Sequence, residues 1–313
     1  MKNVWLIGSG NMAQEYIKVL KALNVNFTVI GRGGDSAKKC EEASGCKVIV
    51  GGLTNFLAEN PAPCTHAIIS VGVESLTHAT CELINYGITK ILVEKPGGLY
   101  VDQVQKLASN SKERGANIYV AYNRRFCASV LKAERIISQT SGVISINFEF
   151  TEWAHIIKNM HKSDQVLARW FLANSTHVVD LAFYLAGAPK KICSFTSGAL
   201  DWHPAASVFC GAGVSKKGAL FSYQANWESA GRWGVEILTN ECRLILRPIE
   251  RLQIQKRNSV TVESVECDYR LDEEFKPGLY LQTQDFLNEI DEKLCNIFNQ
   301  LSMMRVYEKI AGY

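Results

Sequence analysis

The first twenty residues contain the pattern that most limits the possible folds. An apolar run, Val4–Ile7, ends in Gly8-Ser9-Gly10, and an amphipathic stretch with a small residue at Ala13 follows. Glycines at this spacing allow a tight turn and a close approach of the backbone to a ligand, while the small residue lets a helix pack on the strand. The start of such a helix favours phosphate groups. We therefore predict a strand, a turn and a helix that hold a dinucleotide, with contacts from Gly8, Gly10, Asn11 and Met12.

Strand-like and helix-like segments alternate from this turn to about residue 122. Further strands are expected at 27–30, 47–50, 67–71, 90–93 and 118–121, with helices near 55–59, 75–86 and 101–114. Apolar strands separated by helices are typical of a doubly wound parallel sheet, an α/β Rossmann architecture. Ligands bind such sheets at the carboxyl ends of the strands. The residues expected at these ends are Gly8, Arg32, Val71, Gly72, Lys95, Tyr122 and Asn123.

The end of the second predicted strand indicates which dinucleotide is bound. An acidic residue there would bind the ribose of NAD, whereas an arginine accommodates the extra phosphate of NADP. The chain has Arg32 at this position, with Asp35 close by. Arg32, Ser36 and Lys38 or Lys39 would form an anion pocket. NADP(H) is the predicted preference and NAD(H) remains possible; the alternative is a basic surface turn that binds nothing.

A lysine follows the strand predicted at 90–93. The sequence there is Glu94-Lys95-Pro96-Gly97-Gly98. At the end of a buried strand the Lys95 ammonium would be partly desolvated, and the adjacent glycines would admit a ligand. The alternative is a solvated lysine at a strand end.

The second half of the chain has the alternating pattern of half-exposed strands. Ile144, Ile146, Phe148 and Phe150 alternate with small or polar residues, and similar alternation recurs at 219–227, 234–238, 243–246 and 252–255. This predicts a second α/β domain with one large sheet, one face on helices and the other facing a ligand or a partner subunit. We place the domains at 1–122 and 123–313, with a hinge at Tyr122-Asn123.

Composition excludes several classes of protein. The 313 residues include 34 basic and 31 acidic residues, a net charge of +3, so nucleic-acid binding is not expected. The ten cysteines form no CxxC pair, which indicates reduced thiols, and the histidines have no metal-ligand spacing. No run approaches the ~20 apolar residues of a membrane span, and the N-terminus does not resemble a signal peptide. We expect a cytoplasmic protein without a metal site.

Four motifs in this order resemble the Gfo/Idh/MocA family of glucose-fructose oxidoreductase and inositol dehydrogenase-like enzymes. They are GSGNMA at 8–13, the turn at Gly72-Val73 with His78 after it, VEKPGG at 93–98 and YNRRF at 122–126. The resemblance is specific in the first half and looser in the second. It implies a nicotinamide-binding Rossmann domain followed by an α/β domain with an open, mainly antiparallel sheet, which covers the nicotinamide and forms a sugar pocket. It also implies a homodimer or homotetramer, because family members commonly associate through that sheet.

The resemblance assigns two catalytic residues. Lys95 matches the family lysine that binds the reacting oxygen of the substrate, and His177 matches a histidine that exchanges the proton at that oxygen, a task that suits imidazole. One position departs from the pattern: many members have an aspartate four residues before this histidine, and this chain has Ala173. Asn174 would take over substrate hydrogen bonding, and Asp180 would either orient His177 or make a structural contact.

The predicted activity is transfer of a hydride between NADP(H) and a sugar carbinol or carbonyl. Besides the strand-end residues above, Glu94, Lys95 and Pro96 are expected to contact the cofactor, and Trp153, Arg169 and Asn174 the substrate. Arg124 and Arg125 would bind an anion or form an interdomain ion pair. The alternatives are a dehydrogenase of a non-sugar carbonyl or diol, and a dinucleotide-binding sensor that has lost catalysis.

Overall fold

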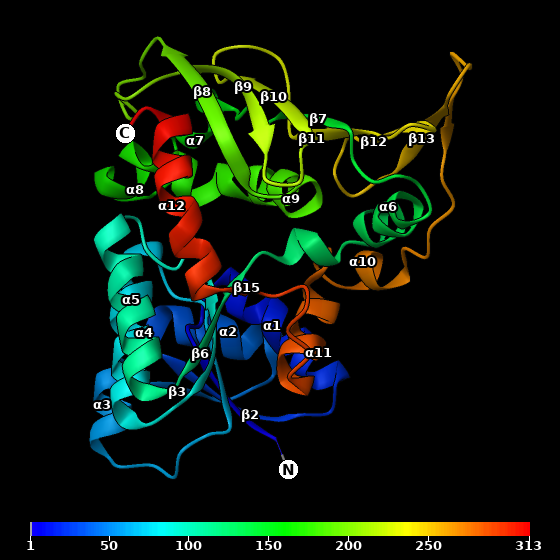
Figure 1. The fold of residues 1–313 in the computed structure, drawn as a ribbon. Coiled ribbons are helices and arrows are strands. Elements are labelled where there is room, and N and C mark those ends of the chain that lie inside the picture. Colours follow the sequence, from blue (N-terminus) through cyan, green and yellow to red (C-terminus); the bar gives the residue numbers. More distant parts are fainter. Residues whose placement is uncertain (1) are drawn as a thin grey trace. The chain divides into compact units, whose positions relative to one another are not determined.

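The computed structural model describes residues 2–313 and divides the chain into two compact units (Figure 1). The first unit runs to Tyr122 and also contains Glu274–Ser302; the second comprises Asn123–Glu273 and Met303–Tyr313. The predicted boundary at 122/123 coincides with the first division. The prediction of one continuous second domain at 123–313 is wrong, because Glu274–Ser302 packs with the first unit.

The first unit is built on a seven-stranded sheet of order β15-β6-β5-β4-β1-β2-β3. Six strands are parallel, and the edge strand β15 pairs antiparallel with β6. The order changes direction between β1 and β4, the place where doubly wound sheets bind ligands. The strands are β1 (Asn3–Ile7), β2 (Asn26–Gly31), β3 (Val48–Val50), β4 (His66–Ile69), β5 (Lys90–Glu94), β6 (Asn117–Ala121) and β15 (Cys295–Asn296).

Helices cover this sheet because its central strands are apolar throughout. Leu6, Ile68 and Leu92, on β1, β4 and β5, are fully buried. Helices α4 and α5 lie side by side, and α1 packs against α2 and α11 (Figure 1). The helices are α1 (Asn11–Ala22), α2 (Gly34–Ser44), α3 (Gly52–Ala58), α4 (Leu76–Tyr86), α5 (Val101–Arg114) and α11 (Leu279–Asn288). The helix α12 (Ile297–Ala311) begins in the first unit and ends in the second.

The second unit contains an eight-stranded sheet of order β14-β13-β12-β11-β7-β10-β9-β8. All neighbouring strands are antiparallel except β7 and β10, which are parallel. The prediction of a mainly antiparallel sheet is confirmed. The strands are β7 (Ser145–Glu149), β8 (Pro189–Ser197), β9 (Val208–Ser215), β10 (Leu220–Asn226), β11 (Gly234–Leu238), β12 (Cys242–Leu246), β13 (Gln253–Lys256) and β14 (Val262–Ser264).

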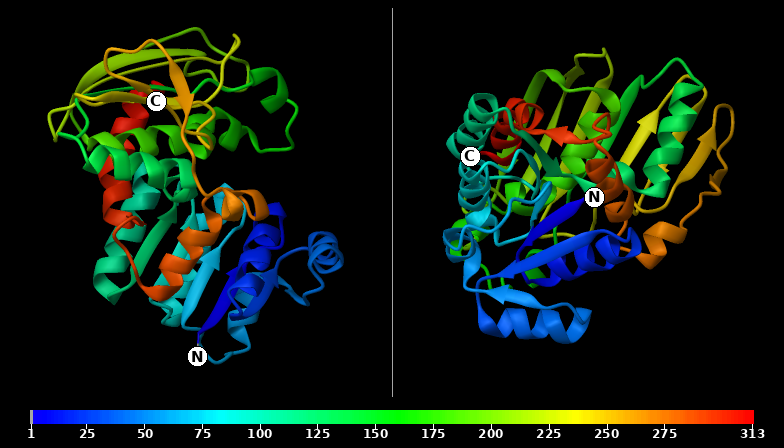
Figure 2. Two further views of the ribbon diagram at one scale, coloured as in Figure 1. Left: turned by 90° about the vertical axis from the view of Figure 1, so that its right-hand side faces the viewer. Right: turned by 90° about the horizontal axis from the view of Figure 1, so that it is seen from below.

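One face of this sheet is buried and the other is exposed, as the alternating sequence predicted. Phe148 stacks on Tyr223 and packs edge-on against Phe183 of α9 (Thr176–Ala186), which runs along the buried face (Figure 2). Phe195 and Leu220 are 67% and 62% exposed. Ile144, predicted to be buried with its neighbours, is 52% exposed because it precedes β7. The remaining helices are α6 (Ala128–Ser138), α7 (Ala154–Ile157), α8 (Asp164–Ala168) and α10 (Arg270–Glu274).

Residues 2–313 contain no membrane-crossing helix, no metal-binding cluster and no disulfide. No helix in that range combines the length and apolar character that a membrane crossing needs. The described histidines, cysteines and acidic residues form no cluster of three or more that could hold a metal ion. The ten cysteines are free thiols.

Candidate functional site

The turn between β1 and α1 requires glycine at its first position. Gly8 has a φ of +125°, a conformation that other residues rarely adopt. A Cβ atom there would lie 2.6 Å from the backbone oxygen of Ser70, which follows β4. The backbone N–H of Ser70 donates to the carbonyl of Ile7, so the two central strand ends are joined at this point. Gly8 is therefore needed by the fold itself.

Gly10 differs from Gly8 because nothing in the described protein requires a glycine there. Its φ is −83°, which any residue can adopt, and a Cβ atom would meet nothing within 4 Å. Gly10 is the N-cap of α1, and no side chain caps this helix, so the first backbone N–H groups face open space. Asn11 and Met12 form the start of the helix. This arrangement fits the pyrophosphate of a dinucleotide, which needs backbone donors and room for close approach.

The predicted phosphate pocket lies after β2. Arg32 and Lys38 are exposed, and the Ser36 hydroxyl lies 2.9 Å from that of Ser9 and donates to the carbonyl of Gly33. The structure thus links the glycine turn to the start of α2. This second helix also lacks a side-chain cap, and Asp35 lies in its first turn. Of the other strand-end residues, Val71 is half-buried and Gly72 exposed after β4.

Lys95 immediately follows β5, at the carboxyl end of the sheet. The Lys95–Pro96 peptide bond is cis. The turn beyond it is held at two backbone oxygens: Thr77 Oγ1 donates to the carbonyl of Gly97 at 3.1 Å, and Gln300 Nε2 donates to that of Pro96 at 3.0 Å. Lys95 itself is half-buried. A lysine on a fixed backbone at the end of a buried strand suits a positioned cation better than a freely solvated one.

Glu94, predicted to contact the cofactor, binds a tyrosine. Its Oε1 accepts a hydrogen bond from Tyr16 Oη of α1 at 2.8 Å. Burial raises the pKa of Glu94, although the Tyr16 hydrogen bond and the charges of Lys95 and Lys276 act in the opposite direction. Burial next to this carboxylate also raises the pKa of Tyr16.

Lys276 is a residue of this region that the sequence analysis missed. Its Nζ lies 3.3 Å from Met12 Sδ at the start of α1. Lys276 belongs to the segment that returns to the first unit, so no local motif indicated its position.

His177 lies in the first turn of α9 in the second unit. Its ring centroid is 5.9 Å from that of Trp233. The residues directly before α9, Phe171–Ser175, form a π-helical turn. Such turns are rare and occur frequently at functional sites.

A buried carboxylate lies beside this turn. Glu152 Oε1 accepts hydrogen bonds from Asn174 Nδ2 at 2.9 Å and Ser175 Oγ at 2.8 Å, and Arg232 Nη1 lies 3.1 Å from Oε2. Asn174, predicted to contact the substrate, therefore has its amide nitrogen directed at Glu152. No sequence motif marked Glu152, because its partners lie more than 20 residues away in the chain.

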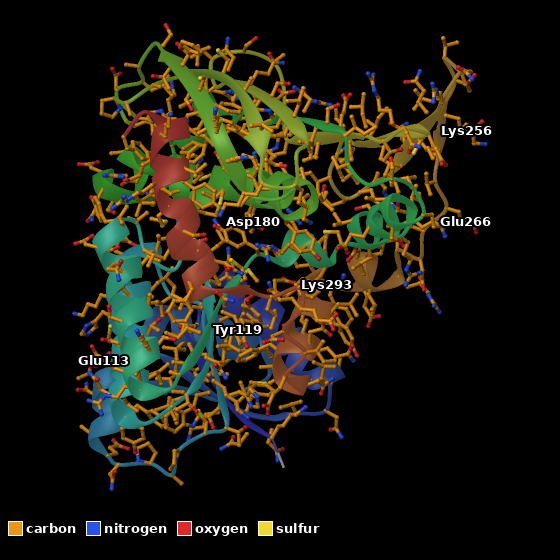
Figure 3. All side chains as sticks on the ribbon, in the orientation of Figure 1. Glu113, Tyr119, Asp180, Lys256, Glu266 and Lys293 are labelled. Atoms are coloured by element: carbon orange, nitrogen blue, oxygen red, sulfur yellow. The ribbon has the colours of Figure 1, made fainter. Side chains whose placement is uncertain are left out.

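The arginines after the predicted hinge form ion pairs inside the second unit. Arg125 binds both carboxylate oxygens of Asp180, which projects from α9 (Figure 3), at 2.6 and 2.8 Å, and Arg124 pairs with Glu250 at 3.1 Å. Burial raises the pKa of Asp180, and Arg125 opposes this shift. Both of these ion pairs join residues of the second unit, and Asp180 makes a structural contact there.

Two further residues of the second unit were predicted to make contacts, Asn123 with the cofactor and Arg169 with the substrate. Asn123, the first residue of the unit, is buried. Arg169 Nη1 lies 3.2 Å from Glu308 of α12, and its guanidinium lies 4.3 Å from the ring centroid of Tyr313. Arg169, which was predicted to contact the substrate, thus makes a structural contact with the C-terminal segment.

The second unit has a cavity of about 740 Å³ next to Trp153. Trp153 is 45% exposed and donates from Nε1 to the carbonyl of Gly231. Trp202 stacks on the buried Trp227 with ring planes 8° apart. Trp202, which no sequence motif marked, lines the same cavity as Trp153. The polar and aromatic lining includes Trp153, His155, Lys158, Asp201, Trp202, Trp227 and Glu228.

Comparison with known proteins identifies the fold. No protein-family model matches the chain, and no curated sequence matches it. A putative NADPH-dependent oxidoreductase from Desulfitobacterium hafniense dcb-2 matches with a TM-score of 0.82 at 15% identity, over 99% of this chain and 94% of that one. Levoglucosan dehydrogenase, in complex with NADH, matches with a TM-score of 0.81 at 16% identity, over 99% of this chain and 96% of that one. UDP-N-acetylglucosamine 3-dehydrogenase from Acidithiobacillus ferrooxidans matches with a TM-score of 0.77 at 15% identity, over 98% of this chain and 96% of that one.

The chain shares the fold of these oxidoreductases and dehydrogenases. This confirms the fold class that the four motifs implied, including a Rossmann sheet followed by a mainly antiparallel one. The identities are too low for the comparisons to assign a substrate or a site residue. In this fold, the glycine turn and Lys95 lie at the carboxyl ends of β1 and β5, and His177 lies on α9, which packs against β7 and β11 of the second sheet.

Proposed function

We propose that the protein is an NADP(H)-dependent oxidoreductase that acts on a sugar or sugar derivative. The observation that carries the cofactor part is the contrast between Gly8 and Gly10. Gly8 is required by its φ and by the contact with Ser70, whereas Gly10 has an ordinary φ and open space beside it. A glycine that the protein does not need for its own backbone supports close approach of a ligand to the start of α1.

The nicotinamide, when bound, supplies or accepts the hydride. In the proposed reaction, the Lys95 ammonium donates a hydrogen bond to the reacting oxygen and polarises it. His177 gives a proton to this oxygen during reduction and takes it back during oxidation. The position of Lys95 after β5 supports its role, as does the π-helical turn that precedes the His177 helix.

The first experiment is a separate titration with NADPH and NADH, followed by energy transfer from tryptophan to the nicotinamide. We expect tighter binding of NADPH, because Arg32 is exposed at the end of β2 where the second phosphate would lie. Tighter binding of NADH would overturn the NADP preference. Binding of neither would contradict the proposed enzyme.

Arg32→Ala is expected to weaken NADPH binding about 10- to 100-fold and to leave NADH binding within about two-fold, because only NADPH has the phosphate that the guanidinium contacts. Arg114→Ala is the matched control, since Arg114 is also exposed but lies at the C-terminal end of α5. An equal loss for both cofactors would show that Arg32 acts on the shared part of the dinucleotide.

The cavity beside Trp153 supports a sugar as the substrate. Sugar rings pack on aromatic faces and hydrogen-bond to nearby polar groups, and the lining offers both. The preference for NADPH favours reduction of a keto-sugar. Oxidation of NADPH with a panel of keto-sugars, and of non-sugar ketones and diols, separates the proposed substrate from the non-sugar alternative. Nucleotide binding without turnover on the whole panel would favour the sensor.

Trp153→Ala is expected to raise KM for the sugar about 10-fold and to change kcat little, because the ring contributes ground-state stacking. Because the Trp153 side chain is half-exposed, we expect the substitution to cost little stability. Ile156→Ala is the control: Ile156 is 43% exposed on the short helix α7, which directly follows Trp153, and it does not line the cavity. An unchanged KM in Trp153→Ala would exclude this cavity as the sugar site.

Two further predictions concern the state of the protein. We propose a homodimer or homotetramer formed through the exposed sheet face that carries Phe195 and Leu220. Sedimentation at micromolar concentration tests this, and a monomer would contradict it.

A cytoplasmic location is also proposed; the free thiols of the described residues are compatible with it.

A further inference from the structure

Glu152 is an acidic residue in a place where a negative charge is costly. Its side chain is 2% exposed, and three groups donate hydrogen bonds to its two oxygens: Asn174, Ser175 and Arg232. Burial raises the pKa of Glu152, and these three donors oppose that shift. Hydrogen bonds donated by all three groups stabilise the ionised carboxylate rather than the acid. The ion pair with Arg232 compensates the buried charge only in part, because the Arg232 side chain is 45% exposed and solvent screens its charge.

Two routes of contact connect this carboxylate to His177. The first runs through the helix: Asn174 and Ser175 bind Glu152 and end the π-helical turn that leads into α9. The second runs through Arg232, whose guanidinium lies 4.8 Å from the ring of Trp233, and Trp233 in turn lies 5.9 Å from the His177 ring. All these residues belong to the second unit.

The other charged groups around α9 have partners of their own. Asp180 is bound by Arg125, Glu149 pairs with Arg247 at 2.6 Å, and Glu134 accepts from Tyr184 at 2.6 Å. At position 173, where an acid would lie one turn before His177, the chain has a buried alanine. Among the residues described here, Glu152 is therefore the carboxylate that binds the helix directly before His177.

We propose that Glu152 replaces the carboxylate missing at Ala173 as the positioning residue of His177. Its charge stabilises the protonated imidazole, and its hydrogen bond fixes the amide of Asn174. With Asn174 Nδ2 donating to Glu152, Oδ1 is left to accept a hydrogen bond from a substrate hydroxyl. During reduction the hydride goes to the carbonyl carbon, the proton of the imidazolium goes to the oxygen, and Glu152 keeps its charge throughout. This inference rests on the proposed role of His177.

The test measures the pKa of the His177 imidazole by NMR in the full-length protein without substrate. Glu152→Gln keeps the shape and removes the charge, so we expect the pKa of His177 to fall by about half a unit or more. Glu149→Gln is the matched control: it also removes an arginine-paired carboxylate, at the end of β7, but Glu149 is hydrogen-bonded to Arg247 rather than to Asn174 or Ser175. We expect no shift in that variant. An unchanged pKa in Glu152→Gln would overturn the proposal.

A second variant tests the replacement directly. Ala173→Asp in the Glu152→Gln background places a carboxylate one helical turn before His177, and we expect it to restore the pKa towards the wild-type value. Ala173→Asp alone should raise that pKa, which keeps the inference testable if Glu152→Gln does not fold. A pKa that does not respond to the acid at position 173 would contradict the equivalence of the two carboxylates.

The kinetic test separates this inference from the proposed function. With a substrate in hand, we expect Glu152→Gln to lower kcat about 10-fold or more and to move the alkaline limb of the pH profile for reduction to lower pH, because His177 must be protonated to act as the acid. If no substrate is turned over but the pKa of His177 depends on Glu152, the proposed function fails while the link between the two residues stands. If turnover occurs with no dependence on Glu152 in either measurement, only the link fails.

Discussion

Lys95→Met is expected to lower kcat about 10²- to 10³-fold and to leave the Kd for NADPH within a few-fold of the wild-type value. Methionine keeps the approximate length of the side chain but cannot donate a hydrogen bond to the reacting oxygen. The backbone of this turn is held by Thr77 and Gln300 through carbonyl groups that the substitution does not change. Steady-state kinetics with a reducible keto-sugar and a separate NADPH titration measure the two effects.

Lys90→Met provides the matched control for this experiment. Lys90 begins the same strand that Lys95 follows, and it pairs with Glu289 at the opposite end. We expect this variant to retain its kcat, because a partly exposed ion pair contributes little even to stability. Equal turnover by Lys95→Met and the wild type would remove Lys95 from the mechanism.

The second large effect is expected from Gly8→Ala, which should destabilise the protein by about 2–5 kcal/mol. Alanine is strained at a φ of +125°, and its Cβ would lie 2.6 Å from the Ser70 backbone oxygen. A backbone atom cannot move aside as the end of a flexible side chain can, so the ends of β1 and β4 would separate. Urea unfolding should show the loss as an earlier transition.

Gly10→Ala separates ligand binding from folding two residues away. We expect its unfolding transition to match that of the wild type, because the added methyl group meets no protein atom within 4 Å. Its affinity for NADPH should fall about 10-fold or more, since the methyl group occupies the space proposed for the pyrophosphate. Wild-type affinity in this variant would indicate that the dinucleotide binds elsewhere, and wild-type stability of Gly8→Ala would contradict the backbone argument.

Much of the first unit could be predicted because its strands and turns are marked by patterns of residues adjacent in the sequence. Val4–Ile7 is apolar and is followed by glycines, so the strand, the turn and the helix could be located from adjacent residues. The same holds for the turn after Lys95, where proline and glycine mark the end of β5. In the second unit, strict alternation predicted β10, in which every second residue is buried.

The parts that could not be predicted depend on contacts between distant residues. The strand β15 has two residues and no periodicity, so its pairing with β6 left no pattern in the sequence. Glu152 looked like any acid near a strand end, and its importance comes from Asn174 and Arg232. The π-helical turn before α9 likewise follows from packing of Phe171–Ser175, which are mostly buried, rather than from a residue that favours it.

The return of Glu274–Ser302 to the first unit determines when that unit can be completed during synthesis. This segment supplies Lys276 beside Met12, Gln300 beneath the turn after Lys95, and β15 at the edge of the sheet. A ribosome that has released only the first 122 residues has released the motif but not these supports. The residues that surround the proposed cofactor site are therefore assembled after the whole second sheet has been made, so a nascent chain would acquire nucleotide affinity only once Ser302 has left the ribosome.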